Sequence, residues 1–374
     1  MKKRRVAAFA LALGMAFTAA GCGSGSSSGS DSSASNGSAV ASSSGDQPTY
    51  DLQVISKGLN NSWMNVVQTG VMDTADAINE EAGYEMVKAS YTGPESQSDI
   101  AVQVQQLNDA INSKPDCIAI SALDADSVND SLQTALDTGI PVITWDERLD
   151  NAPEGSVLCN VGTDNYEAAT LDADMLYEKI VDRIGVMSWS SVAIGHLNRG
   201  LGFIDKFMEH AAADGYTCCV TGNEAFVNGA AGESVSEKDA DIIIEVRVPA
   251  QTTTELASTE AGALLNKSDT IAVFGNTQDC TEGFIVANQN LNVLGTGDDD
   301  IILVGFDAGE VAVQAIRDGV EYGGVNQAPY DIGKQTVETM LKITQGEAVE
   351  DIATSYVWYT VDNLEDEDVA QNLY

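Results

Sequence analysis

Short apolar runs alternate with amphipathic segments along most of this chain, and polar residues follow several of the runs. Residues 301–304 are four branched apolar residues, a run far too short to span a membrane. Such a run is typical of a strand buried on both faces of a parallel sheet, and Asp307 stands where it should end. The arrangement recurs: residues 52–55 lead to Asn60 and Asn61, residues 141–145 to Asp146, and residues 271–274 to Asn276. Because ligands of open α/β sheets bind beyond the carboxyl ends of the strands, this pattern predicts a cleft for a polar, hydroxyl-rich small molecule.

The segments between the apolar runs carry the 3.6-residue period of helices. Over residues 62–83, for example, Trp63, Val67 and Val71 share one face, and Gly83 suits the C-terminal stop. The predicted helices cover residues 62–83, 97–112, 127–137, 166–181, 197–213, 254–265, 281–289, 311–316 and 332–343. The predicted strands lie near residues 52–55, 84–91, 117–121, 142–145, 156–161, 184–188, 218–220, 242–248, 271–274, 301–304, 322–327 and 356–361.

Two successive series of strands and helices predict an α/β fold with two doubly wound, Rossmann-like lobes. The late strands are expected to return and complete the first lobe. Residues 224–241 are polar and contain glycine, so we expect a surface insertion there. A cleft between lobes is a favoured place for a small molecule.

The first 48 residues follow a different pattern. Basic residues 2–5 precede the apolar residues 6–20, which are fewer than the ~20 needed to span a bilayer, so we predict a signal peptide over residues 1–21. The stretch Ala19-Ala20-Gly21-Cys22 resembles the lipobox of bacterial lipoproteins, which implies that Cys22 is lipidated; an ordinary secretory signal is the alternative. Residues 22–48 are rich in serine and glycine and cannot bury a core, so we expect a disordered linker. The protein would then be extracytoplasmic and lipid-anchored to the outer face of the cell membrane.

The charge of the chain excludes some classes of partner. There are 57 acidic residues against 18 basic ones, a net charge of −39, which repels nucleic acid and anionic lipid headgroups. We therefore expect no nucleic-acid partner and no membrane contact other than the anchor. The sequence has two histidines and no Cys-x-x-Cys, and it has no Gly-x-Ser-x-Gly outside the serine- and glycine-rich residues 22–48. Gly295-Thr296-Gly297 lacks the third glycine of a dinucleotide loop. We expect no cofactor, no bound metal and no catalytic residues.

Six stretches, in order between residues 50 and 362, carry a family resemblance. They are Leu59-Asn60-Asn61-Ser62-Trp63, Pro141-Val142-Ile143-Thr144-Trp145-Asp146, Gly162-Thr163-Asp164-Asn165, Asn198-Arg199-Gly200-Leu201-Gly202-Phe203, Val304-Gly305-Phe306-Asp307 and Asn326-Gln327-Ala328-Pro329. With them the chain resembles the type I periplasmic binding proteins of sugar ABC transporters, in particular the ribose-binding-protein-like group.

The resemblance implies a substrate-binding lipoprotein of an ABC importer, not an enzyme. It implies that a monosaccharide or related polyol is bound between the lobes by hinge closure, with an ABC permease as the membrane partner; we expect a monomer. Three crossovers near Asp164, Gln327 and Ser355 would form a three-stranded hinge. The N-terminal lobe would comprise residues 49–164 with 328–354, and the C-terminal lobe residues 165–327 with 355–374.

The resemblance also implies a set of ligand-binding residues. They are Asn61, Trp63, Met64, Asp146, Glu147, Arg148, Arg199, Thr252, Asn276, Thr277, Asp307 and Gln327. Met64 and Thr252 replace aromatic residues of the family, and Thr277 replaces its asparagine, so ribose itself is not implied as the ligand. The chemistry suits a polyol, because hydroxyls pair with both carboxylates and guanidinium groups and a sugar ring packs on an aromatic plane such as Trp63.

Other interpretations of these residues remain open at this point. Asp146 and Asp307 could be helix N-caps, Arg199 a surface residue, and Trp63 a core residue. The chain could also be a ligand sensor of the same fold that signals to a membrane receptor or kinase. A more remote alternative is a secreted sugar-active enzyme, with Asp146 and Asp307 as a carboxylate pair.

Overall fold

A computed structural model describes residues 47–184, 187–192, 197–250 and 253–374. The predicted signal peptide, Cys22, almost all of the predicted linker, and Thr252 lie outside the described residues. Within the described ranges, strands and helices alternate as the hydrophobic pattern predicts. No helix in these ranges combines the length and apolar character that crossing a bilayer requires.

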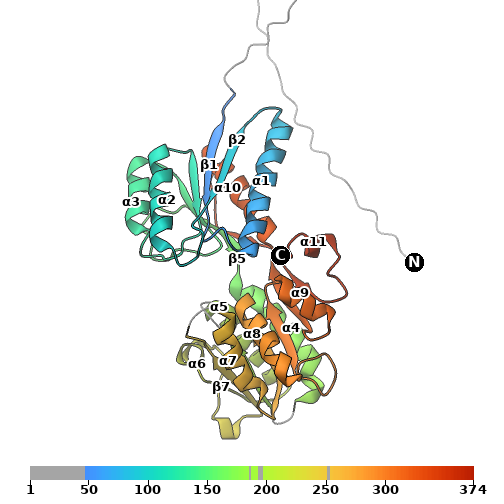
Figure 1. The fold of residues 1–374 in the computed structure, drawn as a ribbon. Coiled ribbons are helices and arrows are strands. Elements are labelled where there is room, and N and C mark those ends of the chain that lie inside the picture. Colours follow the sequence, from blue (N-terminus) through green and yellow to red (C-terminus); the bar gives the residue numbers. More distant parts are fainter. Residues whose placement is uncertain (1–46, 185–186, 193–196, 251–252) are drawn as a thin grey trace, which may run out of the picture. The chain divides into compact units, whose positions relative to one another are not determined.

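The first sheet has the strand order β12-β5-β4-β3-β1-β2, and all of its pairings are parallel. Its strands are β1 (Tyr50–Ile55), β2 (Val87–Thr92), β3 (Cys117–Ile120), β4 (Val142–Trp145), β5 (Asn160–Thr163) and β12 (Ile352–Thr354). Its helices are α1 (Ser62–Ala82), α2 (Ile100–Ser113), α3 (Asn129–Thr138) and α10 (Pro329–Thr344). Separate apolar clusters join the sheet to α1 and α10 and to α2 and α3, so both faces of the sheet are covered (Figure 1).

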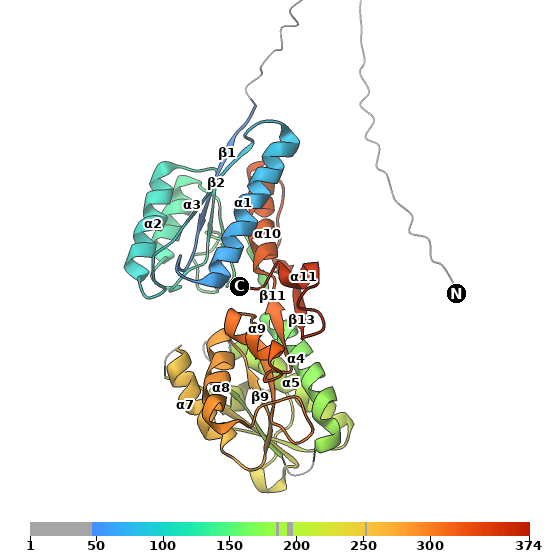
Figure 2. The same ribbon diagram turned by 45° about the vertical axis from the view of Figure 1, so that its right-hand side comes forward.

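Helices α1 and α10 lie side by side although some 250 residues separate them in the sequence (Figure 2). The two helices approach so closely that a Cβ added at Gly70 would lie 2.2 Å from the carbonyl oxygen of Tyr330. A Cβ added at Gly333 would lie 2.2 Å from the carbonyl oxygen of Val67. Helix α10, which follows β11 of the second sheet, is therefore packed closely against α1 of the first.

The second sheet has the order β13-β11-β10-β9-β6-β8-β7 and is parallel except for the antiparallel pairing of β13 with β11. Its strands are β6 (Met187–Val192), β7 (Cys218–Thr221), β8 (Ile242–Arg247), β9 (Thr270–Gly275), β10 (Ile302–Phe306), β11 (Gly323–Gln327) and β13 (Tyr356–Tyr359). The helices of this part are α4 (Asn165–Ile180), α5 (Leu197–Ala213), α6 (Glu224–Gly229), α7 (Thr254–Leu265), α8 (Gln278–Leu291), α9 (Glu310–Arg317) and α11 (Glu367–Ala370). Two short 3-10 helices, η1 (Val181–Arg183) and η2 (Glu237–Asp239), complete the described elements.

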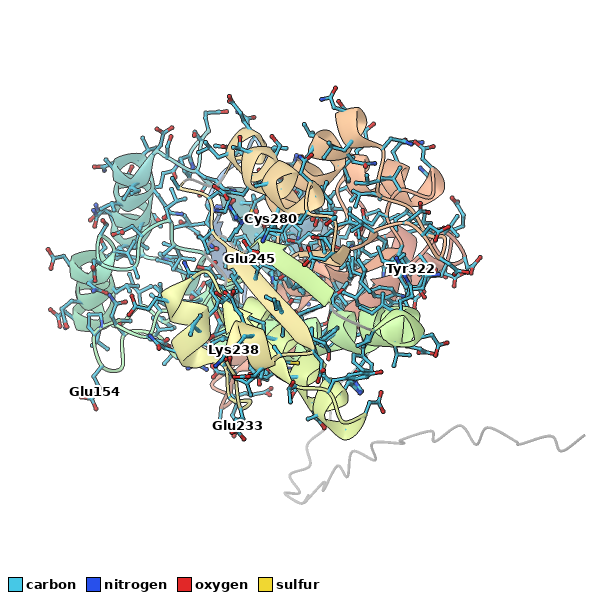
Figure 3. All side chains as sticks on the ribbon, turned by 90° about the horizontal axis from the view of Figure 1, so that it is seen from below. Glu154, Glu233, Lys238, Glu245, Cys280 and Tyr322 are labelled. Carbon is cyan, nitrogen blue, oxygen red and sulfur yellow. The ribbon has the colours of Figure 1, made fainter. Side chains whose placement is uncertain are left out.

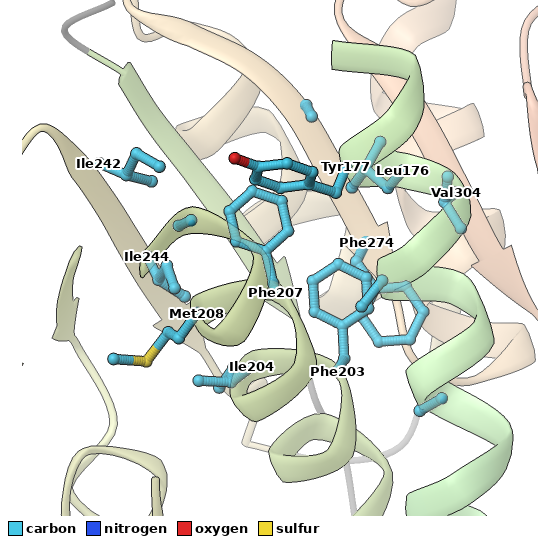
Figure 4. Packing of buried hydrophobic residues seen from close by; sticks show 14 of the residues in the cluster. Leu176, Tyr177, Phe203, Ile204, Phe207, Met208, Ile242, Ile244, Phe274 and Val304 are labelled. Carbon is cyan, nitrogen blue, oxygen red and sulfur yellow. The ribbon is translucent and has the colours of Figure 1, made fainter. Parts of the chain in front are cut away.

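Aromatic packing holds α5 against the second sheet (Figure 4). The ring of Phe203 stacks on that of Phe274 with centroids 4.1 Å apart, and Tyr177 of α4 meets Phe207 edge-on at 5.2 Å. Buried aromatic pairs of this kind contribute more than their buried area alone. This packing holds α5, whose first turn carries Arg199.

The chain passes between the two sheets at three places: after β5 at Asp164, after β11 at Ala328, and between β12 and β13 at Ser355. The α/β fold of two doubly wound lobes joined by three connections is therefore confirmed. The main deviations from the predicted elements are short. β5 begins at Asn160 rather than 156, and β6 covers residues 187–192 rather than 184–188. The three-residue β12 and the short helices α6 and α11 were not predicted, because they are too short to show a period.

The predicted insertion at residues 224–241 is anchored to the rest of the second lobe. Phe226 of α6 is buried, and a Cβ added at Gly200 would lie 2.3 Å from its ring.

Acidic side chains such as Glu154 and Glu233 project from the ribbon, as expected for a chain of this net charge (Figure 3).

Candidate functional site

Asp146 and Asp307 follow the interior strands β4 and β10 directly, and both have a left-handed backbone, with φ of 68° and 74°. Non-glycine residues adopt this conformation rarely, aspartate more readily than most. The N–H of Asp146 donates to the carbonyl of Val161 and that of Asp307 to the carbonyl of Val325, both at 2.8 Å. Neither residue is a helix N-cap, since Gly309 caps α9 and the described segment between β4 and β5 contains no helix. Both carboxylates therefore face other partners.

Arg199 is fixed by contacts on several sides, and its side chain is only 2% exposed. Its guanidinium donates twice to Oδ1 of Asn165, at 2.7 and 3.1 Å, and once to the carbonyl oxygen of Asn276 at 2.9 Å. It lies 3.5 Å from the carboxylate of Asp307 and 3.6 Å above the ring centroid of Phe306. The alternative of a surface arginine is therefore wrong, because this guanidinium is buried and positioned.

Asp307 has further partners in the second lobe. Gln327 donates to its Oδ1 at 2.7 Å, and the hydroxyl of Tyr359 donates to its backbone carbonyl at 2.9 Å. Burial raises the pKa of Asp307 above its ordinary value, and the nearby Arg199 and Gln327 offset this only in part. Hydrogen bonds to an ionised carboxylate favour its charged form. A ligand hydroxyl that donates a hydrogen bond to Asp307 would therefore stabilise the charged carboxylate.

Asp146 has a lysine partner instead of an arginine. Nζ of Lys57 lies 2.9 Å from Oδ2 of Asp146 and 3.2 Å from Oε1 of Glu147. Ser121 also donates to Asp146, at 3.1 Å. Burial lowers the pKa of Lys57, but the two carboxylates outweigh burial, and the net shift of its pKa is upward. The first lobe therefore presents a charged cluster of one ammonium and two carboxylates.

Three predicted residues lie at the start of α1. Oδ1 of Asn61, the N-cap, accepts from the backbone N–H of Met64 at 2.9 Å. Trp63 belongs to the core cluster, as one interpretation held, and stacks on Trp145 with centroids 6.5 Å apart. Its indole N–H is buried and has no hydrogen-bond partner among the described residues. Buried polar groups without partners are rare, so this N–H is suited to a bound molecule.

These side chains meet around a cavity of about 150 Å³. Its lining comprises Lys57, Asn61, Trp63, Met64, Gln97, Asp146, Glu147, Arg199, Gln278, Asp307, Gln327 and Tyr374. Residues from both lobes therefore contribute to one polar site. A neighbouring cavity of about 480 Å³ shares Asp146, Glu147 and Arg199 with it.

Four predicted residues do not line the smaller cavity. Arg148 forms an ion pair with Asp351 and lines the larger cavity. The hydroxyl of Thr277 caps α8, and Asn276 is fully buried, with both polar side-chain atoms lacking a partner among the described residues. Thr252 lies outside the described residues. A ligand-binding role for these four residues stays a prediction.

Four lining residues were not predicted: Lys57, Gln97, Gln278 and Tyr374. Lys57 follows the carboxyl end of β1, so the rule that selected the other strand-end residues could have selected it. Tyr374 carries no such signal, because it follows the last strand by fifteen residues and reaches the cavity only through the tertiary fold.

The sequence of the chain matches a model of the periplasmic binding protein domain over residues 52–348. The chain therefore belongs to the periplasmic binding protein family, and its resemblance to the type I, ribose-binding-protein-like group is confirmed.

Three similar proteins illustrate this group. The ribose import binding protein RbsB of Haemophilus influenzae is 25% identical over 84% of this chain and 91% of its own length. A solved structure from Brachyspira murdochii, described as an ABC transporter, LacI family transcriptional regulator, is 26% identical. It covers 87% of this chain and 99% of its own, with a TM-score of 0.72. An ABC transporter solute-binding protein from Agrobacterium vitis with bound D-fucose is 22% identical, covers 87% of this chain and all of its own, and has a TM-score of 0.65.

Proposed function

We propose that this chain is the lipid-anchored, solute-binding component of an ABC importer. It binds a monosaccharide or related polyol in the smaller cavity, without turnover. The observation that carries the proposal is the mixed lining of that cavity by acceptors, donors and an indole ring from both lobes.

The lining residues suit the hydroxyls of a sugar. Each hydroxyl donates one hydrogen bond and accepts others, so a ring of hydroxyls requires acceptors and donors side by side. Asp146 and Asp307 accept, and Lys57, Arg199 and Gln327 donate. Hydrogen bonds to charged groups are roughly twice as strong as those between neutral groups. Trp63 adds an apolar face and an N–H without a partner among the described residues.

The division into lobes is part of the proposal. Residues 49–164 with 328–354 form the N-terminal lobe, and residues 165–327 with 355–374 form the C-terminal lobe. The assignment of β12 to the first sheet and of β13 to the second supports a boundary at Ser355. The ligand draws the two lobes together by hinge motion at the three connections, and the closed monomer then docks on a permease.

The related proteins support transport rather than catalysis. The curated relative is named as a ribose import binding protein, and one structural neighbour contains a bound sugar. The anchor rests on Cys22 and its lipobox-like context, so the protein is held at the outer face of the membrane by its lipid.

Isothermal titration of the purified chain against pentoses, hexoses and pentitols tests this function. We expect one or a few of these ligands to bind with 1:1 stoichiometry. Asp307→Ala and Arg199→Ala are each expected to weaken binding by about 2 kcal/mol or more, because each leaves a buried partner unpaired. Absence of binding to every compound in the panel would contradict the proposal, and unchanged affinity in both variants would show that the ligand binds elsewhere.

A further inference from the structure

The segment that follows β13 is tied to both lobes near their connections. Asn372 is only 3% exposed, and its carbonyl accepts from the side chain of Asn326 in β11 at 2.8 Å. Its Oδ1 accepts from the backbone N–H of Tyr330 in α10 at 3.3 Å. Leu364 and Val369 are buried in a cluster with α9. These contacts hold the segment in one place.

Tyr374 reaches the cavity from this anchored segment. Its backbone N–H lies 3.4 Å from the carbonyl oxygen of Ala308, the residue after Asp307 in the C-terminal lobe. Its side chain packs against the apolar cluster of the N-terminal lobe that contains Trp63 and Met64. Tyr374 therefore touches both lobes and lines the cavity between them.

The hydroxyl of Tyr374 is buried, and its O–H has no acceptor among the described residues; the backbone N–H of Ala308, which favours the ionised form, is itself a donor. Leaving a buried hydroxyl without an acceptor destabilises a protein, so such groups are usually paired. Burial, together with the negative charge of Asp307, raises the pKa of Tyr374 well above its ordinary value, so the hydroxyl keeps its proton. The group therefore stays a donor as well as an acceptor.

We propose that Tyr374 is a further ligand-binding residue, whose hydroxyl bonds a hydroxyl of the bound sugar and whose ring covers the ligand beside Met64. The inference rests on the proposed function and adds one residue to its site. It also assigns a role to the segment after β13, which carries a side chain into the cavity from the backbone next to Asp307. A bound ligand would then contact this segment as well as the two lobes, and so help to hold the segment in place.

The conservative variant Tyr374→Phe removes only the hydroxyl and keeps the ring. We expect it to weaken the binding of the sugar found by titration by about three- to tenfold, the range of one net hydrogen bond. The melting temperature of the ligand-free protein should not fall. Tyr322→Phe is the matched control, since Tyr322 is half-buried, packs on Trp358 and does not line the cavity; its affinity should equal that of the wild type.

Monodeoxy analogues of the same sugar separate direct contact from a packing role. If Tyr374 bonds one hydroxyl, the loss caused by Tyr374→Phe disappears for the analogue that lacks that hydroxyl. A loss of equal size for every analogue, or no loss at all, overturns the inference while the wild type still binds sugar. If the wild type binds no sugar, the proposed function fails, and this inference fails with it.

Discussion

Asp146 and Asp307 occupy equivalent positions in the two sheets, yet their partners differ in kind. Each follows an aromatic residue at the end of an interior strand, takes a positive φ, and donates its N–H to the neighbouring strand at 2.8 Å. Asp307 faces the buried guanidinium of Arg199, whereas Asp146 faces the ammonium of Lys57, whose side chain is 13% exposed. The two sheets thus present the same backbone feature with different side-chain chemistry.

The difference concerns how firmly each carboxylate is held. A guanidinium is planar, and the contacts of Arg199 with Asn165, Asn276 and Phe306 leave it little freedom. An ammonium is a compact charge on a flexible stem, and Lys57 is shared between Asp146 and the more exposed Glu147. We infer that the C-terminal lobe presents preformed hydrogen-bonding groups, while those of the N-terminal lobe rearrange when the ligand binds.

The largest expected effect is on stability, from removal of the two cations. Arg199→Ala leaves Asp307 buried without its charge partner and should lower the free energy of unfolding by about 3 kcal/mol. Lys57→Ala should cost about 1 kcal/mol, because the side chain of Lys57 is 13% exposed against 2% for Arg199 and Asp146 keeps Ser121 as a donor. Urea unfolding of the two variants measures this. Equal losses would show that the two ion pairs are alike after all.

A smaller effect is expected on ligand affinity from neutralising each aspartate. Asparagine tolerates the left-handed backbone, so Asp307→Asn and Asp146→Asn remove charge without adding strain. We expect Asp307→Asn to weaken sugar binding by about 2 kcal/mol, or roughly 30-fold, and Asp146→Asn by less, because Lys57 can turn to another acceptor. Titration calorimetry measures both affinities. A greater loss of affinity in Asp146→Asn would show that the preformed hydrogen-bonding groups belong to the N-terminal lobe instead.

The smallest effect is a change of stability with pH caused by Glu321, a buried acid near Asp307. Among the described residues, no buried acid takes a similar place near Asp146. Glu321 is 1% exposed, and its Oε1 lies 3.0 Å from the hydroxyl of Tyr359, which donates its single proton to the backbone carbonyl of Asp307. Burial raises the pKa of Glu321 well above its ordinary value, so the folded state retains a proton that the unfolded state loses near pH 4. Stability therefore falls as the pH rises from about 4 towards the folded-state pKa of Glu321.

Glu321→Gln removes that titration and keeps both a hydrogen-bond donor and an acceptor beside the hydroxyl of Tyr359. Its melting temperature should exceed that of the wild type by roughly 2 °C at pH 7.5, and the difference should shrink towards pH 4.5. Melting curves at both values test the sign. A variant less stable than the wild type at pH 7.5 would mean that the ionised form of Glu321 is stabilised by contacts other than Tyr359.

Much of the fold follows from local pattern. The 3.6-residue period of residues 62–83 predicts α1 and the left-handed Gly83 that ends it, which the structure contains. The buried runs predict β4 and β10 and place an aspartate at the end of each. Strand β12, with three residues at a sheet edge, shows no such period, and its pairing with β5 joins residues far apart in the sequence.

The sequence alone determined the alternation of strands and helices and the polar residues at the strand ends, because both depend on neighbours within a turn or a strand. Only the tertiary structure decided which of those residues meet. Lys57 and Asp146 are 89 residues apart in the sequence, and Arg199 and Asp307 are 108 residues apart. Tyr374 lies fifteen residues after the last strand. Such partnerships depend on how strands are ordered in a sheet and how helices pack on it, which no local period encodes.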